Sequence, residues 1–427
     1  MIENEKPYIA RSLWTATANP TPDCPVLTGA EETEVAVIGG GFSGLSAALH
    51  LAEAGVAVTL LEAETPGWGA SGRNGGQVNP GLKEDPDAIE AKFGPDLGGR
   101  MVRLSGGAGD FVFDLIKRLG IDCAARQPGW IQPVHNEAAL NTVSKRVGQW
   151  QRRGAPLRLL SRAETAELVG TDAYLAGMID PRGGNLHPLN YSLGLAWAAQ
   201  RAGARLHGRS PALRMEQNGA AHVIHTPNGR LSARKVLICT NGYSGSFNPG
   251  IARSVVPIRS VQVATAPLSD NVRRSILPGG HSASDSRRLL LYFRLDPEGR
   301  FIMGGRGDYT ESGTEKQFSL LQEASQRLFP QLSEASWAFK WGGFVAMTAD
   351  HYPHVVRAGT RVWGAIGYNG RGVAMATVLG KVLADLAQGI PEEEHDFPVT
   401  DVKEIPFYFL RKPVVAATVA WSRWRDG

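Results

Sequence analysis

The sequence predicts a two-domain α/β (α+β) protein, in which a discontinuous Rossmann-type domain is interleaved with a second domain built on a mixed sheet. Three observations support this fold class. Residues 34–62 read as strand, glycine turn, helix and strand, the βαβ pattern of a parallel sheet. Similar strand and turn patterns return at 235–242 and 362–388. Residues 121–186, which lie between the first and second of these segments, alternate in character and are rich in Pro and Gly. This pattern is typical of a separate sheet domain.

We therefore expect the domains to alternate along the chain. Residues 1–30 contain several prolines among small polar residues and are expected to be an extended lead-in. We assign 31–120, 187–250 and 341–395 to the Rossmann-type domain, 121–186 and 251–340 to the second domain, and 396–427 to a C-terminal tail.

The composition excludes several classes of protein. A chain of 427 residues, 43% hydrophobic and 20% charged, is long enough for two cores and ordinary for a soluble protein. The net charge of +4 is scattered rather than clustered, so no nucleic-acid partner is expected. Cys24, Cys123 and Cys239 lie far apart without a Cys/His cluster, so we expect neither disulfides nor a metal site.

The chain ends indicate a cytoplasmic protein. The first residues lack the pattern of a signal peptide, and no stretch approaches the ~18 apolar residues that a membrane span needs. The tail 405–424 mixes aromatic and basic residues and could lie on a membrane, but Pro413 interrupts it. We expect it to pack on the body, with no membrane partner, and leave the oligomeric state open.

The first βαβ unit predicts a bound dinucleotide. Val35, Val37 and Ile38 form a buried strand that leads into a G-x-G-x-x-G turn. In this turn Gly39 permits the tight bend, Gly41 lets a pyrophosphate approach the backbone, and Gly44 lets the helix over 45–54 pack closely. The phosphates would lie at the helix N-terminus, where free N–H groups favour negative charge.

Glu62 narrows the choice of dinucleotide. It ends the second strand, about twenty residues past the turn, where a carboxylate accepts hydrogen bonds from ribose hydroxyls and repels a 2′-phosphate. FAD or NAD therefore fits, and NADP does not.

The remaining elements follow from periodicity and turn residues. Asp85–Gly120 has helical spacing, with breaks allowed at the glycine pairs that begin at Gly98 and Gly106. Further helices are expected over 137–152, 162–169, 189–202, 315–329 and 374–388, a strand over 255–266, and hairpins around Asn228-Gly229 and Pro297–Gly299.

Two further glycine-rich segments favour FAD over NAD. The loop over 67–77 follows the ribose acid and would lie at the carboxyl edge of the sheet, where ligands bind. The turn over 364–372 precedes a helix whose positive end would stabilise an anionic reduced flavin beside N1 and C2=O, a need that nicotinamide lacks. No second nucleotide fingerprint is visible, so the substrate itself should reduce the flavin.

These motifs resemble those of a known superfamily. The segments GGGFSGLSAALHLAEAG, GASGRNGGQ, LICTNGYSG, WGGFVAMTADHYP and GAIGYNGRGVAMATVLGKVLADLAQG, with Glu62, are similar to the D-amino acid oxidase, glycine oxidase and sarcosine oxidase superfamily. Within it, GASGRNGGQ and the lead-in SLW look most like gamma-glutamylputrescine oxidases.

The resemblance implies an FAD domain of the glutathione-reductase type and a substrate domain whose mixed sheet faces the flavin. It implies oxidation of a C–N bond of a small amine or amino acid by hydride transfer to flavin N5, imine hydrolysis, and reoxidation by molecular oxygen with release of hydrogen peroxide. A dehydrogenase that reduces a quinone or carrier protein, and a flavin-binding module without turnover, remain alternatives. Since neither Cys nor His occurs in 69–77 or 364–372, we expect FAD to be non-covalent.

The resemblance also places the site residues. On the substrate side it implies Arg371, which could pair with a carboxylate, together with Tyr368, Tyr292 and Arg306; the alternatives are a solvent or phosphate contact for Arg371 and plain surface charge for Arg306. The expected cofactor-binding residues are Gly39, Gly41, Phe42, Ser43, Gly44, Glu62, Ala63, Gly69, Ala70, Ser71, Arg73, Asn74, Gly75, Gly76, Gln77, Ala212, Thr240, Asn241, Gly242, Gly367, Asn369, Gly370, Arg371, Gly372 and Val373. Arg294 and Gln262 are further substrate-side candidates.

Overall fold

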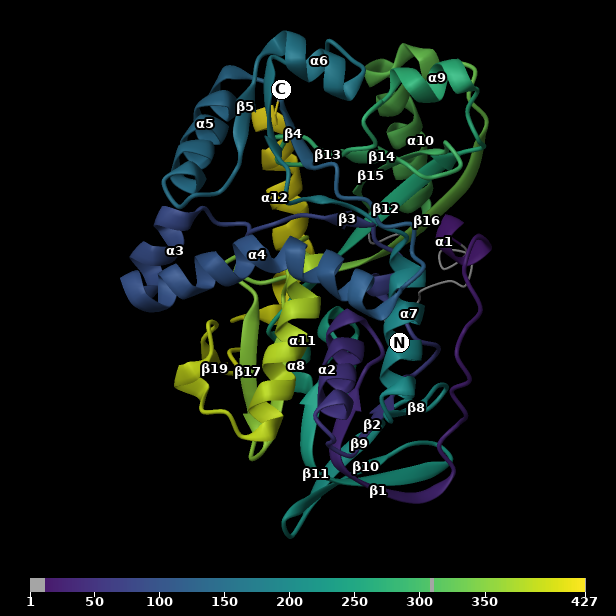
Figure 1. Cartoon of the computed structure of the whole chain (residues 1–427), viewed down its shortest axis with the longest axis vertical. Coiled ribbons are helices and arrows are strands. Elements are labelled where there is room, and N and C mark those ends of the chain that lie inside the picture. Colours follow the sequence, from purple (N-terminus) through teal and green to yellow (C-terminus); the bar gives the residue numbers. More distant parts are fainter. Residues whose placement is uncertain (1–11, 308–310, 427) are drawn as a thin grey trace.

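The computed structural model describes residues 12–307 and 311–426, and its first large element is a nine-stranded sheet (Figure 1). Its main strand order is β19-β17-β18-β11-β1-β2-β8, and the hairpin β9-β10 extends from β11. These strands are β1 (Gly29–Ile38), β2 (Val58–Leu61), β8 (Arg205–His207), β9 (Arg214–Asn218), β10 (Ala221–His225), β11 (Gly229–Ile238), β17 (His354–Gly359), β18 (Val362–Ile366) and β19 (Val399–Asp401). Because β18, β11, β1, β2 and β8 run parallel, their carboxyl ends meet at one edge, where the glycine turns lie.

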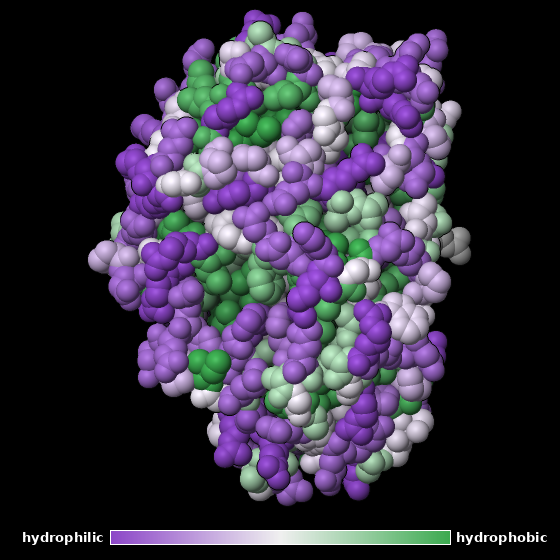
Figure 2. Space-filling view, viewed as in Figure 1, coloured by the Kyte–Doolittle hydropathy of each residue, from purple (hydrophilic) through white to green (hydrophobic). Residues whose placement is uncertain are grey.

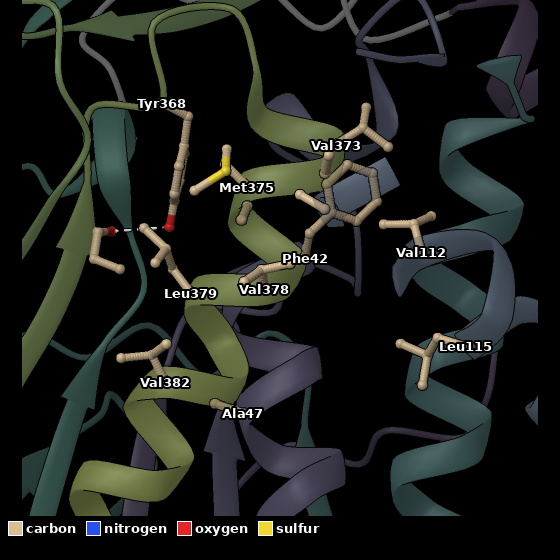
Figure 3. Packing of buried hydrophobic residues seen from close by; sticks show 14 of the residues in the cluster. Phe42, Ala47, Val112, Leu115, Tyr368, Val373, Met375, Val378, Leu379 and Val382 are labelled. Atoms are coloured by element: carbon tan, nitrogen blue, oxygen red, sulfur yellow. Dashed lines mark hydrogen bonds between the residues drawn. The ribbon is translucent and has the colours of Figure 1, made fainter. Parts of the chain in front are cut away.

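Helices pack on this sheet through a shared apolar core. α2 (Phe42–Glu53) lies between α11 (Gly372–Gln388) and α7 (Pro188–Arg201), and α4 (Pro95–Leu119) packs against α11. Figure 3 shows Phe42 of α2 among side chains from α4 and α11. This packing fixes the first turns of α2 and α11 relative to each other. α8 (Pro249–Arg253) follows η3 (Asn241–Tyr243).

The sheet of the second domain is mixed, as predicted, and has eight strands. Its order is β16-β12-β15-β14-β13-β4-β6-β5, in which β13 and β4 pair in parallel and the other neighbours are antiparallel. The strands are β4 (Trp130–Val134), β5 (Arg158–Leu160), β6 (Ala176–Asp180), β12 (Val256–Thr265), β13 (Ser282–Ser284), β14 (Tyr292–Leu295), β15 (Phe301–Arg306) and β16 (Trp337–Met347).

One face of this second sheet packs on α10 (Glu311–Leu328). Side chains from β12, β14 and β15 build the core beneath α10 together with Phe329: Val261, Val263, Phe293, Phe301 and Met303. The alternate residues of these strands therefore face the first domain. α5 (Glu137–Gln151), α6 (Arg162–Val169), α9 (Asp270–Ser275) and η4 (Pro330–Leu332) complete the domain.

Two predicted domain boundaries are wrong. The boundary placed at residue 341 falls inside β16, which pairs with β12 along its length, so the second sheet extends to Met347. Residues 341–347 continue the strand through the pair Gly342-Gly343, which pairs with β12 and does not form a turn, so nothing marks a change of domain before Thr348. The boundary at 396 separates β19 from the sheet it joins, because β19 pairs with β17.

The lead-in is not wholly extended either. Ser12 caps the short helix α1 (Leu13–Ala16) by accepting a hydrogen bond from the N–H of Thr15. Leu13 and Trp14 are buried, and Trp14 packs 5.9 Å from the ring of Trp341. The rest of the predicted segment before Ser12 lies outside the described residues.

The break in the long helical stretch lies at a glycine that we did not predict. α3 (Pro86–Phe93) ends at Gly94, whose φ of 81° starts a new helix at Pro95. Gly98 and Gly106 lie inside α4 instead, where a Cβ would come within 2.6 Å of the Glu90 Cα and 2.9 Å of the Trp150 ring, respectively. These two glycines therefore permit close packing rather than a kink.

The C-terminal residues form η5 (Glu392–Glu394), η6 (Tyr408–Leu410) and α12 (Arg411–Asp426). Over residues 411–419 of α12, one stripe is half-buried and the other residues are exposed, so the predicted packing of the tail on the body rests on that stripe. Within the described ranges, no helix is both long and apolar enough to span a bilayer. Figure 2 shows one face of the molecule, which is mostly hydrophilic, with hydrophobic residues visible in several patches and hollows.

Candidate active site

The first glycine turn has the close contacts that a dinucleotide fingerprint requires. Gly39 has a φ of 106°, and a Cβ at this position would lie 2.9 Å from the carbonyl oxygen of Cys239. A Cβ on Gly44 would lie only 1.9 Å from the carbonyl oxygen of Gly39. Gly41 approaches the Ser71 hydroxyl, which a Cβ would meet at 2.9 Å. The turn thus brings α2 against β1, and its backbone at Gly41 lies close to the Ser71 hydroxyl.

The N-terminus of α2 is suited to a phosphate group. Gly41 precedes the helix with no side-chain cap, and no hydrogen bond to another described residue satisfies the N–H groups of Gly41 and Ser43. The N–H of Phe42 donates to Ser71 Oγ at 3.0 Å, so this N–H already has a hydroxyl as its acceptor. Free N–H groups and the helix dipole favour an anion at this point.

Glu62 lies beside the same turn. Its Oε2 accepts a hydrogen bond of 2.6 Å from the N–H of Gly40, and its Oε1 accepts one of 2.9 Å from the N–H of Glu64. Burial raises the pKa of this carboxyl, and these two N–H donors oppose the rise. Each carboxylate oxygen can accept a second bond, so the geometry leaves room for ribose hydroxyls.

Two smaller candidates lie near Glu62. Ala63 is exposed directly after it. Ala212 lies in the coil between β8 and β9, half-buried, two residues after Ser210, whose N–H donates to the Glu62 carbonyl at 2.9 Å. Both positions are thus at the edge of the sheet where the ribose of a dinucleotide is expected.

The loop over 69–77 is held between the two domains. It begins with η2 (Ala70–Gly72). Asn74 accepts a bond from the N–H of Gly76 and donates to the carbonyls of Ala70 and Ser71, which closes the loop on itself. A Cβ on Gly69 would touch the Tyr243 ring at 3.6 Å.

The second domain contributes most of the outer contacts of this loop. The carbonyl of Arg73 accepts hydrogen bonds from Gln262 Nε2 at 2.6 Å and from Trp341 Nε1 at 3.0 Å. Arg294 Nε donates to the Gly75 carbonyl at 2.7 Å. Gln77, which begins β3 (Gln77–Val78), donates to the Ala283 carbonyl at 2.9 Å. β3 pairs with β7 (Gly184–Asn185), so the loop is fixed at both ends.

The second glycine turn, over 367–372, is held by amide side chains. Asn241 Oδ1 accepts a bond of 2.9 Å from the N–H of Gly367. Asn369, at a φ of 50°, accepts from the N–H of Thr348 and donates to its hydroxyl. Thr240 bonds to Ser244 through their hydroxyls at 2.7 Å, and Gly242 packs against Ala346.

This turn leads into an uncapped helix. Arg371 is the N-cap residue of α11 and makes no side-chain capping bond, while Gly370 has a φ of 86°. Among the residues that the structure describes, none accepts the N–H groups of Gly372 and Val373. The α11 N-terminus therefore presents a positive dipole end toward the edge of the sheet.

Tyr368 does not lie where the resemblance implied. Its hydroxyl bonds to Ser43 Oγ at 2.8 Å and donates to the Ala365 carbonyl at 3.2 Å, inside the core between α2 and α11 (Figure 3). Burial raises its pKa far above the usual range. We therefore interpret Tyr368 as a link between the two glycine turns and do not retain it among residues that face a substrate.

Arg371 and Trp130 form a pair of donors without acceptors. The guanidinium of Arg371 stacks over the Trp130 ring with a separation of 4.8 Å. Arg371 Nη1 and Trp130 Nε1 are both buried, and neither has a hydrogen-bond partner among the described residues. Burial, together with the nearby charge of Arg146, lowers the pKa of Arg371 to about 10, although Asp180 opposes the shift. Two such donors call for an anionic or carbonyl group that the described residues do not supply.

Tyr292 and Arg306 lie on neighbouring strands of the second sheet but in different surroundings. The Tyr292 ring lies over Gly304 and near Gly75, and its hydroxyl bonds to Ser260 Oγ at 2.9 Å. Burial raises the pKa of Tyr292 to about 12. Arg306, which pairs with Ser260 in the sheet register, lines a cavity of about 170 Å³ with Leu289, Leu291, Gln317, Leu320 and Leu321. Tyr292 thus lies at the loop, whereas Arg306 lies at the α10 end of β15.

Sequence reasoning missed two contributors. Trp130 follows a Pro-Gly pair and gave no signal beyond strand propensity; only its position opposite Arg371 reveals it. Trp14 belongs to the lead-in, yet its Nε1 donates to the Asn74 carbonyl at 2.9 Å and supports the loop from outside the two sheets. Gln262, a weaker candidate, has an Oε1 that is buried without a partner among the described residues, near Gly75.

These features fit FAD. The uncapped α2 N-terminus fits a pyrophosphate, Glu62 fits a ribose, and the loop over 69–77 with the α11 N-terminus fits the flavin end. The model of the FAD dependent oxidoreductase family, DAO, matches residues 34–386. The chain belongs to this family, and FAD is its cofactor.

Individual relatives agree with this assignment. The chain is 32% identical over 420 residues to gamma-glutamylputrescine oxidoreductase of Escherichia coli, which covers 97% of this chain and 98% of the relative. It is 35% identical to a probable oxidoreductase, OrdL, of Rhizobium meliloti, which covers 97% of each. The crystal structure of glycine oxidase from Geobacillus kaustophilus superposes with a TM-score of 0.70 at 21% identity, covering 84% of this chain and 95% of that one. The solved structure confirms the predicted two-domain fold.

Proposed function

We propose that this FAD-dependent oxidoreductase oxidises the C–N bond of an amine that also carries a carboxylate. The observation that supports the substrate class is the pair of buried donors, Arg371 Nη1 and Trp130 Nε1, which lack acceptors among the described residues. A carboxylate would accept from both and would offset the burial of the guanidinium. The Escherichia coli relative is named for gamma-glutamylputrescine, an amine with such a group.

The chemistry divides between cofactor and protein. Bound FAD supplies a hydride acceptor at N5, and its reoxidation by oxygen yields hydrogen peroxide. The substrate carbon next to nitrogen loses the hydride, and water hydrolyses the resulting imine to a carbonyl compound and a released amine. The open α11 N-terminus favours negative charge at the flavin, and Tyr292 and Gln262 border the space beside Gly75. We also propose that FAD is held non-covalently, so acid precipitation should release it.

The substrate class is tested by substitution of the donor pair. Arg371→Met and Trp130→Phe should each raise the KM of a carboxylate-bearing amine roughly 10- to 150-fold, because a hydrogen bond to a charged group contributes ~1.5–3 kcal/mol. Turnover should change less, since the carboxylate binds equally in ground and transition states. Trp130→Phe keeps the ring on which Arg371 stacks.

The matched control is the same amine with an amide in place of the carboxylate. Its KM should change much less in both variants. If its KM rises as much as that of the carboxylate substrate, the donor pair does not recognise the anion. If no amine reduces the flavin anaerobically in the unsubstituted protein, the proposed oxidation itself is wrong.

A second candidate differs only in the electron acceptor. A dehydrogenase that passes electrons to a quinone or carrier protein is favoured by the exposed apolar surface of α12. Relatives at 25–26% identity are named D-amino acid dehydrogenases. Stoichiometric hydrogen peroxide in air would support the oxidase, and its absence with intact dye reduction would support the dehydrogenase.

A further inference from the structure

The C-terminal segment over 405–426 exposes a cluster of large apolar side chains. We call this cluster the C-terminal surface; it comprises Phe407, Phe409, Leu410, Val414 and Trp421, with exposed fractions of 73%, 73%, 43%, 58% and 51%. These are five of the twelve large hydrophobic residues that are exposed within the described ranges, so apolar exposure is concentrated in this one segment. Such a concentration marks an interaction site rather than ordinary surface.

α12 exposes apolar side chains on the side that faces away from the body. Arg411, Val415 and Val419 are half-buried and share the stripe that faces the body. Val414, Ala417 and Trp421, at i, i+3 and i+7, are exposed on another stripe. A helix that merely covered the body would present polar residues there.

The positive charge of this segment indicates which class of partner it would bind. Residues 405–426 hold four bases, Arg411, Lys412, Arg423 and Arg425, and one acidic residue, Asp426. The exposed Arg288 lies 5.5 Å from the Trp421 ring and adds positive charge beside it. Apolar and aromatic side chains interspersed with bases are the composition of helices that lie in a membrane interface and attract anionic lipid headgroups.

We propose that residues 405–426 dock this protein on the surface of a membrane that contains anionic lipids. The helix would lie in the plane of the interface, since no helix in the described part of the chain is long and apolar enough to cross it. The family model ends at residue 386, before this segment begins. The inference holds for either electron acceptor.

Vesicle flotation of the full-length protein with FAD bound tests this docking. We expect it to float with vesicles of phosphatidylcholine and phosphatidylglycerol, and much less with phosphatidylcholine alone. Phe407→Ser with Phe409→Ser should abolish flotation. Lys412→Glu should weaken binding to the anionic vesicles roughly 10- to 30-fold, because it changes the charge near the surface by two units.

The control is Leu213→Ser, which removes a side chain that is 54% exposed in the coil between β8 and β9. It should float like the unsubstituted protein, and all variants should retain their flavin content. No flotation on anionic vesicles, or flotation that is unchanged in the double phenylalanine variant, would overturn the proposal. A dimer that the phenylalanine substitutions dissociate, without vesicle binding, would instead identify the C-terminal surface as a contact between copies.

Discussion

Single residues at the first glycine turn set how closely the helix, the strand and the cofactor approach. The motif predicted three different roles for Gly39, Gly41 and Gly44, and the close contacts of Gly39 and Gly44 agree with those roles. The contact at Gly44 is the shortest of the three, because its Cβ position is only 1.9 Å from a carbonyl oxygen of the turn. No rotamer change can relieve a clash with backbone.

Gly44→Ala should therefore separate α2 from the turn. We expect a loss of ~1–3 kcal/mol or more in the free energy of unfolding, with a matching loss of bound flavin, measured by visible absorbance after gel filtration. Gly107→Ala is the control: Gly107 is exposed in α4, and a Cβ there meets nothing within 4 Å. It should leave flavin content unchanged and stabilise the helix by up to ~1 kcal/mol. Equal flavin retention in both variants would contradict this account of Gly44.

The candidate substrate side was only partly predictable at this scale. A glycine-turn motif places Arg371 near the flavin end of the site, but motif spacing does not show where a side chain points. Tyr368 illustrates this, since it is three residues away and yet bonds to Ser43 in the core. Trp130 could not be found from sequence at all, because its role depends on a contact between a strand of one domain and a helix of the other.

At the scale of elements, periodicity and turn residues predicted most helices and hairpins. α6 spans the predicted 162–169, and Pro297–Gly299 lies in the turn between β14 and β15. The prediction errors arise where one local sequence pattern is compatible with two different structures. Gly98 and Gly106 permit helix contacts and do not break α4, and the apolar run of β16 carries no mark of the domain it joins.

The contact between α1 and α7 predicts acid sensitivity. His187 is the N-cap of α7; its Nδ1 accepts from the N–H of Asn190 at 3.1 Å, and its Nε2 bonds to Thr17 at 3.0 Å. Burial, and then the charge of Arg294, lowers its pKa from 6.5 to about 4. Folding therefore disfavours the protonated imidazole, so the stability that depends on neutral His187 is present above pH 6.5 and lost as pH falls toward 4.

This loss is measured by thermal unfolding between pH 7 and pH 5. The melting temperature should fall more steeply in the unsubstituted protein than in His187→Asn, since asparagine keeps an N-cap acceptor without a titrating group. His225→Asn is a suitable comparison, because His225 pairs with Glu216 in an exposed hairpin. Identical pH dependence in all three proteins would show that His187 does not govern this sensitivity.

For the whole molecule, the loop over 69–77 is one of the parts that connect the two domains. Sequence alone predicted that this loop contacts the cofactor, but the structure also shows it clamped by Gln262, Trp341 and Arg294 of the second sheet. Residues far apart in sequence make these bonds, so no local pattern could predict them. Cofactor binding and the packing of the two domains should consequently be coupled.

Arg294 gives the sharpest test of that coupling. It is buried, and it donates to the carbonyls of Gly75 and Leu186, both at 2.7 Å, and to Asn185. Arg294→Met would leave two buried carbonyls without this donor, at a cost of ~1–3 kcal/mol each. Although Arg294 belongs to the second domain, the variant should lose FAD affinity, measured by fluorescence titration of the apoprotein. Arg274→Met, on the exposed face of α9, should bind FAD normally.

The unsubstituted holoprotein should unfold in one calorimetric transition, and FAD should shift that whole transition to higher temperature. Two transitions, of which only one responds to FAD, would show that the domains are energetically independent.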